Sequence, residues 1–225
     1  MTTASLLTLI FSPANGDGVD GPSDRLGPRH ARVRMQPRAD ADDDAVTLAR
    51  VRAGDERAIG DLFRMYASDL VAFARRYVHS DDIAREIVQD VFLWVLQHHR
   101  DWTVTSTIRS YVYGATRHRV LDYLKHAAVE RRWAEQGGGD IVTPVAPVWA
   151  DDAVLRDERK RALAIAIDHL PESRRTTLAL RYGHDLSYAE IAHILGASVK
   201  AVENQLNRTL RQLGTLLGEG HSAAE

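Results

Sequence analysis

The sequence predicts an all-α protein: two small helical domains joined by a flexible linker, the C-terminal one a helix-turn-helix domain of winged-helix-like type. Apolar residues recur at steps of three and four residues over 46–125 and again over 151–217, which is the period of amphipathic helices. Neither stretch alternates polar and apolar residues for long enough to build a sheet. Between them, Gly137–Gly139, Pro144 and Pro147 forbid a continuous helix.

The chain divides into five segments by composition. The first is rich in Gly, Pro, Asp and Arg and shows no sustained period, so we expect it to be disordered. Met35 lies just before the first helical pattern, so whether the residues before it are an extension or follow a misplaced start stays open. The last segment is small and polar, and we expect it to fray. The predicted segments are the extension 1–44, a helical domain 45–133, a linker 134–150, a helix-turn-helix domain 151–217 and a tail 218–225.

The first domain reads as a compact group of three or four amphipathic helices. Gly54 and Asp55 interrupt the first helical pattern, and the polar run 79–82 interrupts the second. A loop with Trp102 and several β-branched residues precedes the last helix of the domain. The predicted helices lie near 46–51, 58–78, 83–96 and 108–125, with the loop at 98–107.

In the second domain, the stretch Ser187–Leu213 predicts a helix-turn-helix. Ser187 and Glu190 form an S-x-x-E capping box at the start of a short helix. Gly196 suits the left-handed end of that helix, and Ser198 can cap the next one. The second helix has an apolar stripe and an opposite polar face, whose side chains suit base edges and phosphates. An ordinary helical hairpin with a solvated polar face is the alternative interpretation.

The segment Arg100–Arg132 carries seven cations against three anions, interleaved with tryptophan and tyrosine. Single-stranded nucleic acid is bound by such sets, because cations follow the phosphates and rings stack on unpaired bases. Aromatic residues of the core beside solvated arginines would give the same pattern, so both interpretations stay open.

Composition excludes several other classes. The net charge of −2 argues against a chain that coats nucleic acid indiscriminately, and the absence of cysteine excludes disulfides and thiolate zinc sites. No apolar run approaches the roughly 20 residues that span a bilayer, so we expect no membrane insertion and a cytoplasmic protein. We find no glycine-rich phosphate loop, no H-E-x-x-H and no nucleophile motif, so we predict no catalytic residue, no metal and no cofactor. Adjacent His98 and His99 would point apart on a helix, which disfavours a shared metal.

Two motif blocks resemble the extracytoplasmic-function (ECF) group of bacterial RNA polymerase sigma factors. The first begins at Asp82 with DIAREIVQDVF, similar to the family's D-A-E-D-x-x-Q-E-x-F, and continues at Arg109 with RSYVYGATRHRVLDYLK. The second is Leu170-Pro171-Glu172 followed by LRYGHDLSYAEIA from Leu180 and the helix pair after it. The two blocks in this order, with a linker between them, are highly specific, and the resemblance covers about 46–217.

The resemblance implies a non-enzymatic subunit that binds core RNA polymerase and promoter DNA. The first domain would dock on the polymerase clamp and open the minus-ten element, and the second would read the minus-thirty-five element. Matched positions for polymerase binding are Glu86, Gln89, Asp90 and Phe92. Those for the minus-ten element are Trp102, Arg109, Tyr113, Arg117, His118, Arg119 and Lys125. Those for the minus-thirty-five element are Lys200, Ala201, Glu203, Asn204, Asn207 and Arg208, with Arg174 and Arg175 as phosphate contacts.

The linker is long enough for the two domains to contact both promoter elements at once. About 20 extended residues reach at most roughly 70 Å, and two turns of B-DNA span about 70 Å. The resemblance also implies an anti-sigma factor as a partner. His118 and Glu203 depart from the residues frequent in the family, asparagine and lysine, which puts those two contacts in doubt. The alternative is a free-standing helix-turn-helix regulator that binds duplex DNA alone. Neither the promoter sequence nor the activating signal follows from the sequence.

Overall fold

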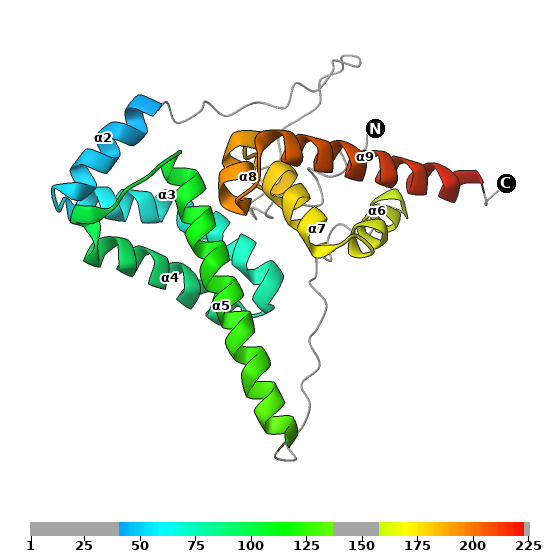
Figure 1. The fold of residues 1–225 in the computed structure, drawn as a ribbon, viewed down its shortest axis with the longest axis horizontal. Helices are drawn as coiled ribbons and strands as arrows, with labels where there is room; N and C mark the ends of the chain where they lie inside the picture. The colour runs from blue at the N-terminus through cyan, green and yellow to red at the C-terminus, as the bar shows by residue number, and fades with distance from the viewer. Residues whose placement is uncertain (1–40, 137–157, 223–225) are drawn as a thin grey trace, which may run out of the picture.

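The computed structural model describes residues 41–136 and 158–222 (Figure 1). Their elements are α2 (Ala41–Arg52), α3 (Glu56–Val78), α4 (Asp81–Gln97), η1 (His99–Asp101), α5 (Ile108–Gln136), α6 (Glu158–Asp168), α7 (Glu172–Leu178), η3 (Ala179–Gly183), α8 (Tyr188–Leu195) and α9 (Val199–Ser222). These residues contain no strand, which confirms the all-α class, and the helix-turn-helix carries no β-wing within them. The disorder expected before residue 41, the linker core at 137–150, the helical start at 151–157 and the chain end at 223–225 lie outside the described residues.

The helix boundaries of the first domain follow from local capping. The Asp55 side chain accepts hydrogen bonds from the backbone N–H groups of Arg57 and Ala58, which fixes the start of α3. Ser80 caps α4 in the same way. The first helix begins at Ala41, four residues before the predicted domain boundary at 45, and the acidic residues of its first turn favour that start.

Helices α3, α4 and α5 enclose the core of the first domain. Phe73 of α3 is fully buried and makes an edge-to-face contact with Tyr113 of α5, with ring centroids 5.6 Å apart. Trp102, from the loop before α5, is also fully buried and contacts Tyr111 edge-on. The N-terminus of α5 is held from a distance, because the Ile108 N–H donates to the Asp44 carboxylate at 2.8 Å. Loop, first helix and α5 therefore form one packed unit.

The second domain forms the predicted helix-turn-helix. Both hydrogen bonds of the capping box between Ser187 and Glu190 are present at the start of α8. Gly196 ends that helix with φ of 62°, the left-handed conformation that glycine adopts without strain. The Ser198 side chain accepts from the Ala201 N–H and caps α9. These three local predictions are confirmed.

The two domains pack against each other. Helix α8 lies beside the N-terminal half of α5, whereas the C-terminal half of α5 projects away from the body (Figure 1). The buried apolar residues of both domains belong to one continuous core. The sequence predicted two separate domains and gave no sign of this contact.

Candidate nucleic-acid interface

The polar face of α9 is open to solvent. Lys200, Asn204 and Arg208 are exposed at steps of four residues and therefore lie along one face of the helix. Ala201 and Asn207 are exposed beside them. Glu203 is half-buried, and its carboxylate accepts a hydrogen bond from Lys200 Nζ at 2.9 Å. The face thus offers amide and guanidinium groups that can reach base edges in a groove.

The opposite face of α9 packs on α7 through a polar clamp that sequence reasoning missed. Gln205 Nε2 donates to the Ser173 carbonyl at 3.0 Å and to the Thr177 hydroxyl at 3.0 Å. This clamp fixes the rotation of α9, so the exposed face keeps its direction. The available signal was the position of Gln205, next to Val202 and Leu206 of the apolar stripe.

The two arginines of α7 are not equally free to bind phosphate. Arg174 is half-buried and donates to Gln212 Oε1 of α9 at 2.7 Å. The Arg175 side chain is only 12% exposed and pairs with Glu172 at 3.1 Å. Arg175 therefore stabilises the start of α7 here, and its predicted phosphate contact would require this pair to break.

Two of the aromatic residues predicted at the minus-ten element lie in the core. Trp102 and Tyr113 are both 0% exposed. Neither ring can stack on a base without leaving the apolar interior, so the core interpretation describes them in this structure. Burial also raises the pKa of the Tyr113 hydroxyl above its usual range. The sequence left both interpretations open, because an aromatic residue in a basic segment has the same pattern whether it packs inward or outward.

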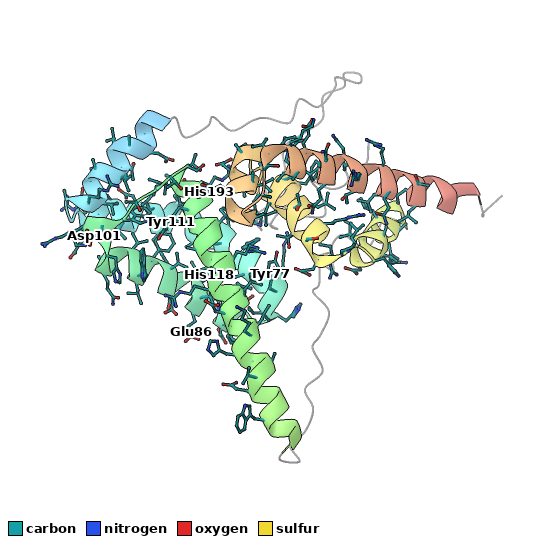
Figure 2. All side chains as sticks on the ribbon, viewed as in Figure 1. Tyr77, Glu86, Asp101, Tyr111, His118 and His193 are labelled. Atoms are coloured by element: carbon teal, nitrogen blue, oxygen red, sulfur yellow. The ribbon has the colours of Figure 1, made fainter. Side chains whose placement is uncertain are left out.

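Two of the basic residues predicted on α5, His118 and Arg119, line a groove. His118, Arg119 and Lys125 are exposed, Arg117 is half-buried, and His118 Nε2 lies 3.5 Å from the Asp122 carboxylate. Arg109 is turned the other way and donates to the His184 carbonyl of the second domain. The groove has a volume of about 640 Å³, in the range of small-molecule sites. It is lined by residues of α4, α5 and α8 that include Trp94, Tyr111, His118, Arg119, His193 and Ile194; Figure 2 marks Tyr111, His118 and His193.

The residues predicted to bind polymerase also differ in exposure. Glu86, Gln89 and Asp90 are exposed on α4, as their predicted role requires. Phe92 is 5% exposed and contacts Phe63 edge-to-face at 5.1 Å, so the prediction that it forms part of the binding surface is not supported. Its neighbours Leu93, Trp94 and Leu96 are the exposed apolar residues of this helix.

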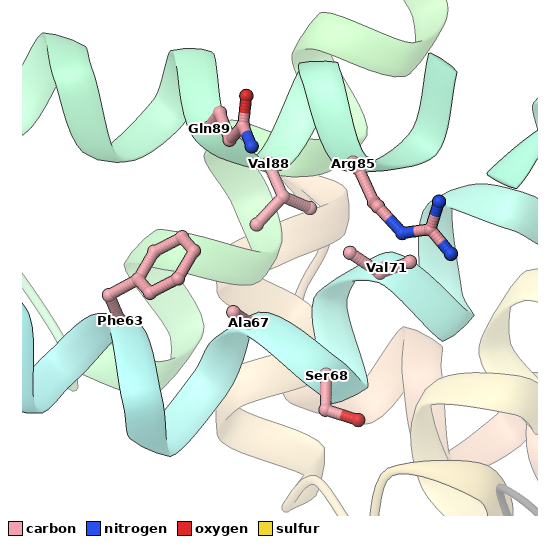
Figure 3. A pocket seen from close by; sticks show the side chains of 7 residues that line it. All are labelled: Phe63, Ala67, Ser68, Val71, Arg85, Val88 and Gln89. Carbon is pink, nitrogen blue, oxygen red and sulfur yellow. The ribbon is translucent and has the colours of Figure 1, made fainter. Parts of the chain in front are cut away.

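A shallow pocket adjoins the α4 surface (Figure 3). Phe63, Ala67 and Val71 of α3 and Val88 of α4 supply apolar walls, and Gln89 lies at one end. Arg85 lies at the other end, where Asp81 and Asp82 hold its guanidinium at 3.1 Å each. A partner that inserts an apolar side chain here would meet a polar rim.

The described residues contain no group of three histidine, aspartate or glutamate side chains that could hold a metal ion. The rings of His98 and His99 each bond a backbone carbonyl of the preceding helical turn, at 2.9 and 2.8 Å. Within the described part of the chain, no helix is both long and apolar enough to cross a membrane.

Comparison with known families identifies both domains. A model of sigma-70 region 2 matches residues 62–129, and a model of sigma-70 region 4 matches residues 160–213. RNA polymerase sigma factor YlaC of Bacillus subtilis is 26% identical over 156 residues, which cover 69% of this chain and 90% of the relative. The ECF RNA polymerase sigma-E factor of Escherichia coli is 27% identical over 177 residues, covering 73% of this chain and 89% of the relative.

Solved structures share the fold. CnrH in complex with the cytosolic domain of CnrY superposes with a TM-score of 0.53 at 22% identity, covering 78% of this chain and 97% of that chain. RpoE in complex with the anti-sigma factor NepR from Bartonella quintana gives 0.51 at 19% identity, covering 71% and 96%. The two region models, in this order on two helical domains, show that the chain belongs to the sigma-70 family, in the group of ECF sigma factors.

Proposed function

We propose that this chain directs core RNA polymerase to promoters through two reading surfaces, the polar face of α9 and the groove beside α5. The observation that carries the proposal is the exposure of both surfaces, with polar side chains of the kind that contact DNA. The protein acts by binding and has no catalytic step of its own.

The α9 surface is suited to the duplex at the minus-thirty-five element. Asn204 and Asn207 can pair with adenine, and Arg208 can pair with guanine or reach a phosphate. Lys200 lies one turn before Asn204 and adds a phosphate contact when its pair with Glu203 breaks. Ala201 supplies a small apolar surface of the kind that contacts a thymine methyl group.

The α5 groove is suited to the opened strand at the minus-ten element. A base that leaves the stack costs a few kcal/mol and must be held by rings and hydrogen bonds. His118 and Arg119 supply polar groups to the groove, and Trp94 and Tyr111 line it with partly exposed rings. We therefore assign base stacking to Trp94 and Tyr111 in place of the buried Trp102 and Tyr113.

The α4 surface is suited to the polymerase. Glu86, Gln89 and Asp90 form an exposed polar face beside the exposed Leu93 and Leu96, a mixture typical of protein interfaces. We also propose an anti-sigma factor as a partner, since the similar RpoE structure is a complex with one.

Run-off transcription with core polymerase, with and without this chain, tests the proposal. We expect promoter-selective transcripts from a genomic template library only when the chain is present. If no such transcript forms, the proposal fails. Tight binding of a duplex operator by the chain alone, without polymerase, would instead support a free-standing regulator.

A further inference from the structure

Helix α2 holds both ends of the loop between η1 and α5. At the entry, Arg52 Nε donates to the Trp102 carbonyl at 2.9 Å. At the exit, the Asp44 carboxylate accepts from the Ile108 N–H at 2.8 Å. The two bonds therefore fix the peptide groups on either side of residues 103–107. Asp44 and Arg52 lie about 12 Å apart along one helix, so α2 sets the separation of the two loop ends.

Helix α2 is itself anchored in the first domain. Val51 is fully buried, and Leu48 packs against the same core. The helix also contacts both η1 and α3. A partly buried carboxylate such as Asp44 is costly unless it is paired; burial raises its pKa, and the bond from the Ile108 N–H opposes that rise. The Asp44 contact is therefore part of a packed framework.

The loop between these two ends is polar and open to solvent. Thr103 and Thr105 are exposed, whereas Trp102 before them and Ile108 after them are buried. Thr105 also approaches α8, since its Oγ1 lies 3.4 Å from His193 Nε2. Both α2 bonds, in contrast, lie within the first domain. They therefore hold the loop whatever contacts α8 makes with it.

The exit of the loop determines where α5 and the groove beside it begin. Thr107 and Ser110 form a reciprocal cap: the Ser110 N–H donates to Thr107 Oγ1 at 3.0 Å, and Ser110 Oγ donates to the Thr107 carbonyl at 2.9 Å. The Ile108 N–H is another of the donors that a first helical turn leaves unpaired, and it is the one that Asp44 accepts. Ser110 and Tyr111 line the groove, so a shift at Asp44 moves the groove wall.

Trp102 connects the entry of the loop to the same groove. Its ring is fully buried and contacts the Tyr111 ring edge-on, with centroids 5.3 Å apart. Tyr111 is one of the two rings to which we assign base stacking. Both ends of the loop therefore act on this ring, one through the backbone of α5 and the other through Trp102. Arg52, which holds the Trp102 carbonyl, acts on Tyr111 without touching it.

We propose that α2 positions the groove beside α5, with Asp44 and Arg52 as positioning residues that keep Tyr111 in the orientation that accepts an unpaired base. The inference rests on the proposed function, because it concerns the same groove. Neither residue touches DNA in this role, and each acts by holding the loop. A base that leaves the stack must be held by groups that are already in place, so a loosened loop lowers the affinity for the opened strand.

Hydrogen exchange on the full chain tests whether α2 holds the loop. Asp44→Ala should speed the exchange of the amides of residues 103–111 about tenfold, because the Ile108 N–H loses its acceptor. Asp43→Ala removes the same charge from an exposed neighbouring position, so it is the matched control and should leave the exchange unchanged. Unchanged exchange in Asp44→Ala would overturn the inference.

Binding of a single strand tests whether the loop positions the groove. The full chain is combined with core polymerase, and the probe is a fluorescent oligonucleotide with the non-template strand of a promoter that the run-off assay has selected. Asp44→Ala and Arg52→Met should each weaken binding about tenfold. Asp44→Asn keeps an oxygen that can accept from the Ile108 N–H, so its affinity should stay within about twofold of the unaltered chain. Equal affinities of Asp44→Ala and the unaltered chain would refute the positioning role.

The other binding surfaces separate positioning from a general loss of folding. Asp44→Ala should keep its affinity for core polymerase and for upstream-element duplex, because the exposed polar faces proposed for these partners lie on α4 and α9. A loss of all three affinities in the same proportion would show that Asp44 serves folding only, and the inference would be wrong. If the unaltered chain with core polymerase gives no promoter-selective transcript, the proposed function itself fails. A chain that directs transcription and binds the single strand equally well with Asp44→Ala refutes the positioning role alone.

Discussion

Helices α9 and α5 carry the two predicted DNA-reading surfaces, and the structure presents them differently. On α9 the residues that would meet base edges all lie on an exposed face, and the residues behind them are clamped to α7 by Gln205. The DNA-binding residues predicted on α5 lie in three places: on the surface, at the contact with the second domain, and in the core. His118 and Arg119 are exposed, Arg109 binds the second domain, and Tyr113 is buried.

The difference shows that the exposure of a helix face depends on how many other helices pack against that helix. Helix α9 ends the fold and packs through one stripe, so its other face is free for recognition. Helix α5 is surrounded by α3, α4 and α8, so its aromatic residues serve packing first. The α9 surface is therefore complete in this structure, whereas the groove beside α5 takes part of its wall from α8.

The largest effect that tests this comparison is on stability. Trp102→Ala should lower the free energy of unfolding of the first domain by about 3–5 kcal/mol, because it removes a fully buried ring. Chemical denaturation followed by circular dichroism measures it. Trp94→Ala is the matched control: that ring is 38% exposed and should change stability far less while reducing promoter opening. Equal stability losses would place both rings in the core.

The next effect is on recognition by α9. The double variant Asn204→Ala with Arg208→Ala should reduce transcription from promoters that depend on the upstream element by about a hundredfold, since each base contact contributes about 1–3 kcal/mol. Both side chains are exposed, so folding is unaffected. Binding to core polymerase, measured by co-elution, should be retained. Loss of core binding would show that α9 is a polymerase contact.

Much of the fold was predictable because its determinants are local. The capping box at Ser187, the left-handed Gly196 and the acidic start of α4 each specify a boundary within a few residues of sequence. The three- and four-residue spacing of apolar residues predicted in the same way which face of each helix points inward. The polar face of α9 was predictable for the same reason, because a polar residue opposite an apolar stripe must face outward.

The contact between the two domains was not predictable, because the residues that pair across it are far apart in sequence. Tyr77 and Thr176 are 99 positions apart, and Tyr113 and His184 are 71 apart. Tyr77, Tyr113 and Thr176 are ordinary residues on their helices, and His184 follows η3. The same limit applies to Phe92 and Trp102, where the choice between core and surface depends on which other helices pack nearby. Motif matching located the helices and could not decide which side chains face out.

A smaller effect follows from the titration of His184. Burial, with the nearby Arg76 and Arg109 charges, lowers its pKa to about 3 from the ordinary value of 6.5. The folded chain therefore holds a neutral ring, and its stability is complete above about pH 6.5. As pH falls below that value, protonation favours the unfolded chain by about 1.4 kcal/mol per pH unit until pH nears 3.

Chemical denaturation between pH 7.5 and 5.5 measures this response. The free energy of unfolding should fall by about 1.4 kcal/mol over the whole range, most of it below pH 6.5. Tyr113 faces His184, and burial raises the pKa of its hydroxyl, so Tyr113 stays neutral over this range. His169→Ala, which removes an exposed histidine of the same domain, should leave the response intact. A flat profile in both proteins would mean that the His184 ring does not become protonated on unfolding.

The smallest effect concerns charge on the α9 surface. Glu203 accepts a hydrogen bond from Lys200 at 2.9 Å and so neutralises a cation that would otherwise meet a phosphate. Glu203→Gln should raise the affinity of the full chain for upstream-element duplex a few-fold. It should also steepen the dependence of log K on log salt by about one, since one more phosphate is neutralised. Filter binding at several salt concentrations measures both, and Glu86→Gln on α4 makes the same charge change away from α9. If affinity falls for one sequence alone, Glu203 reads a base, because its carboxylate would accept from a cytosine amino group that the amide pairs with less well.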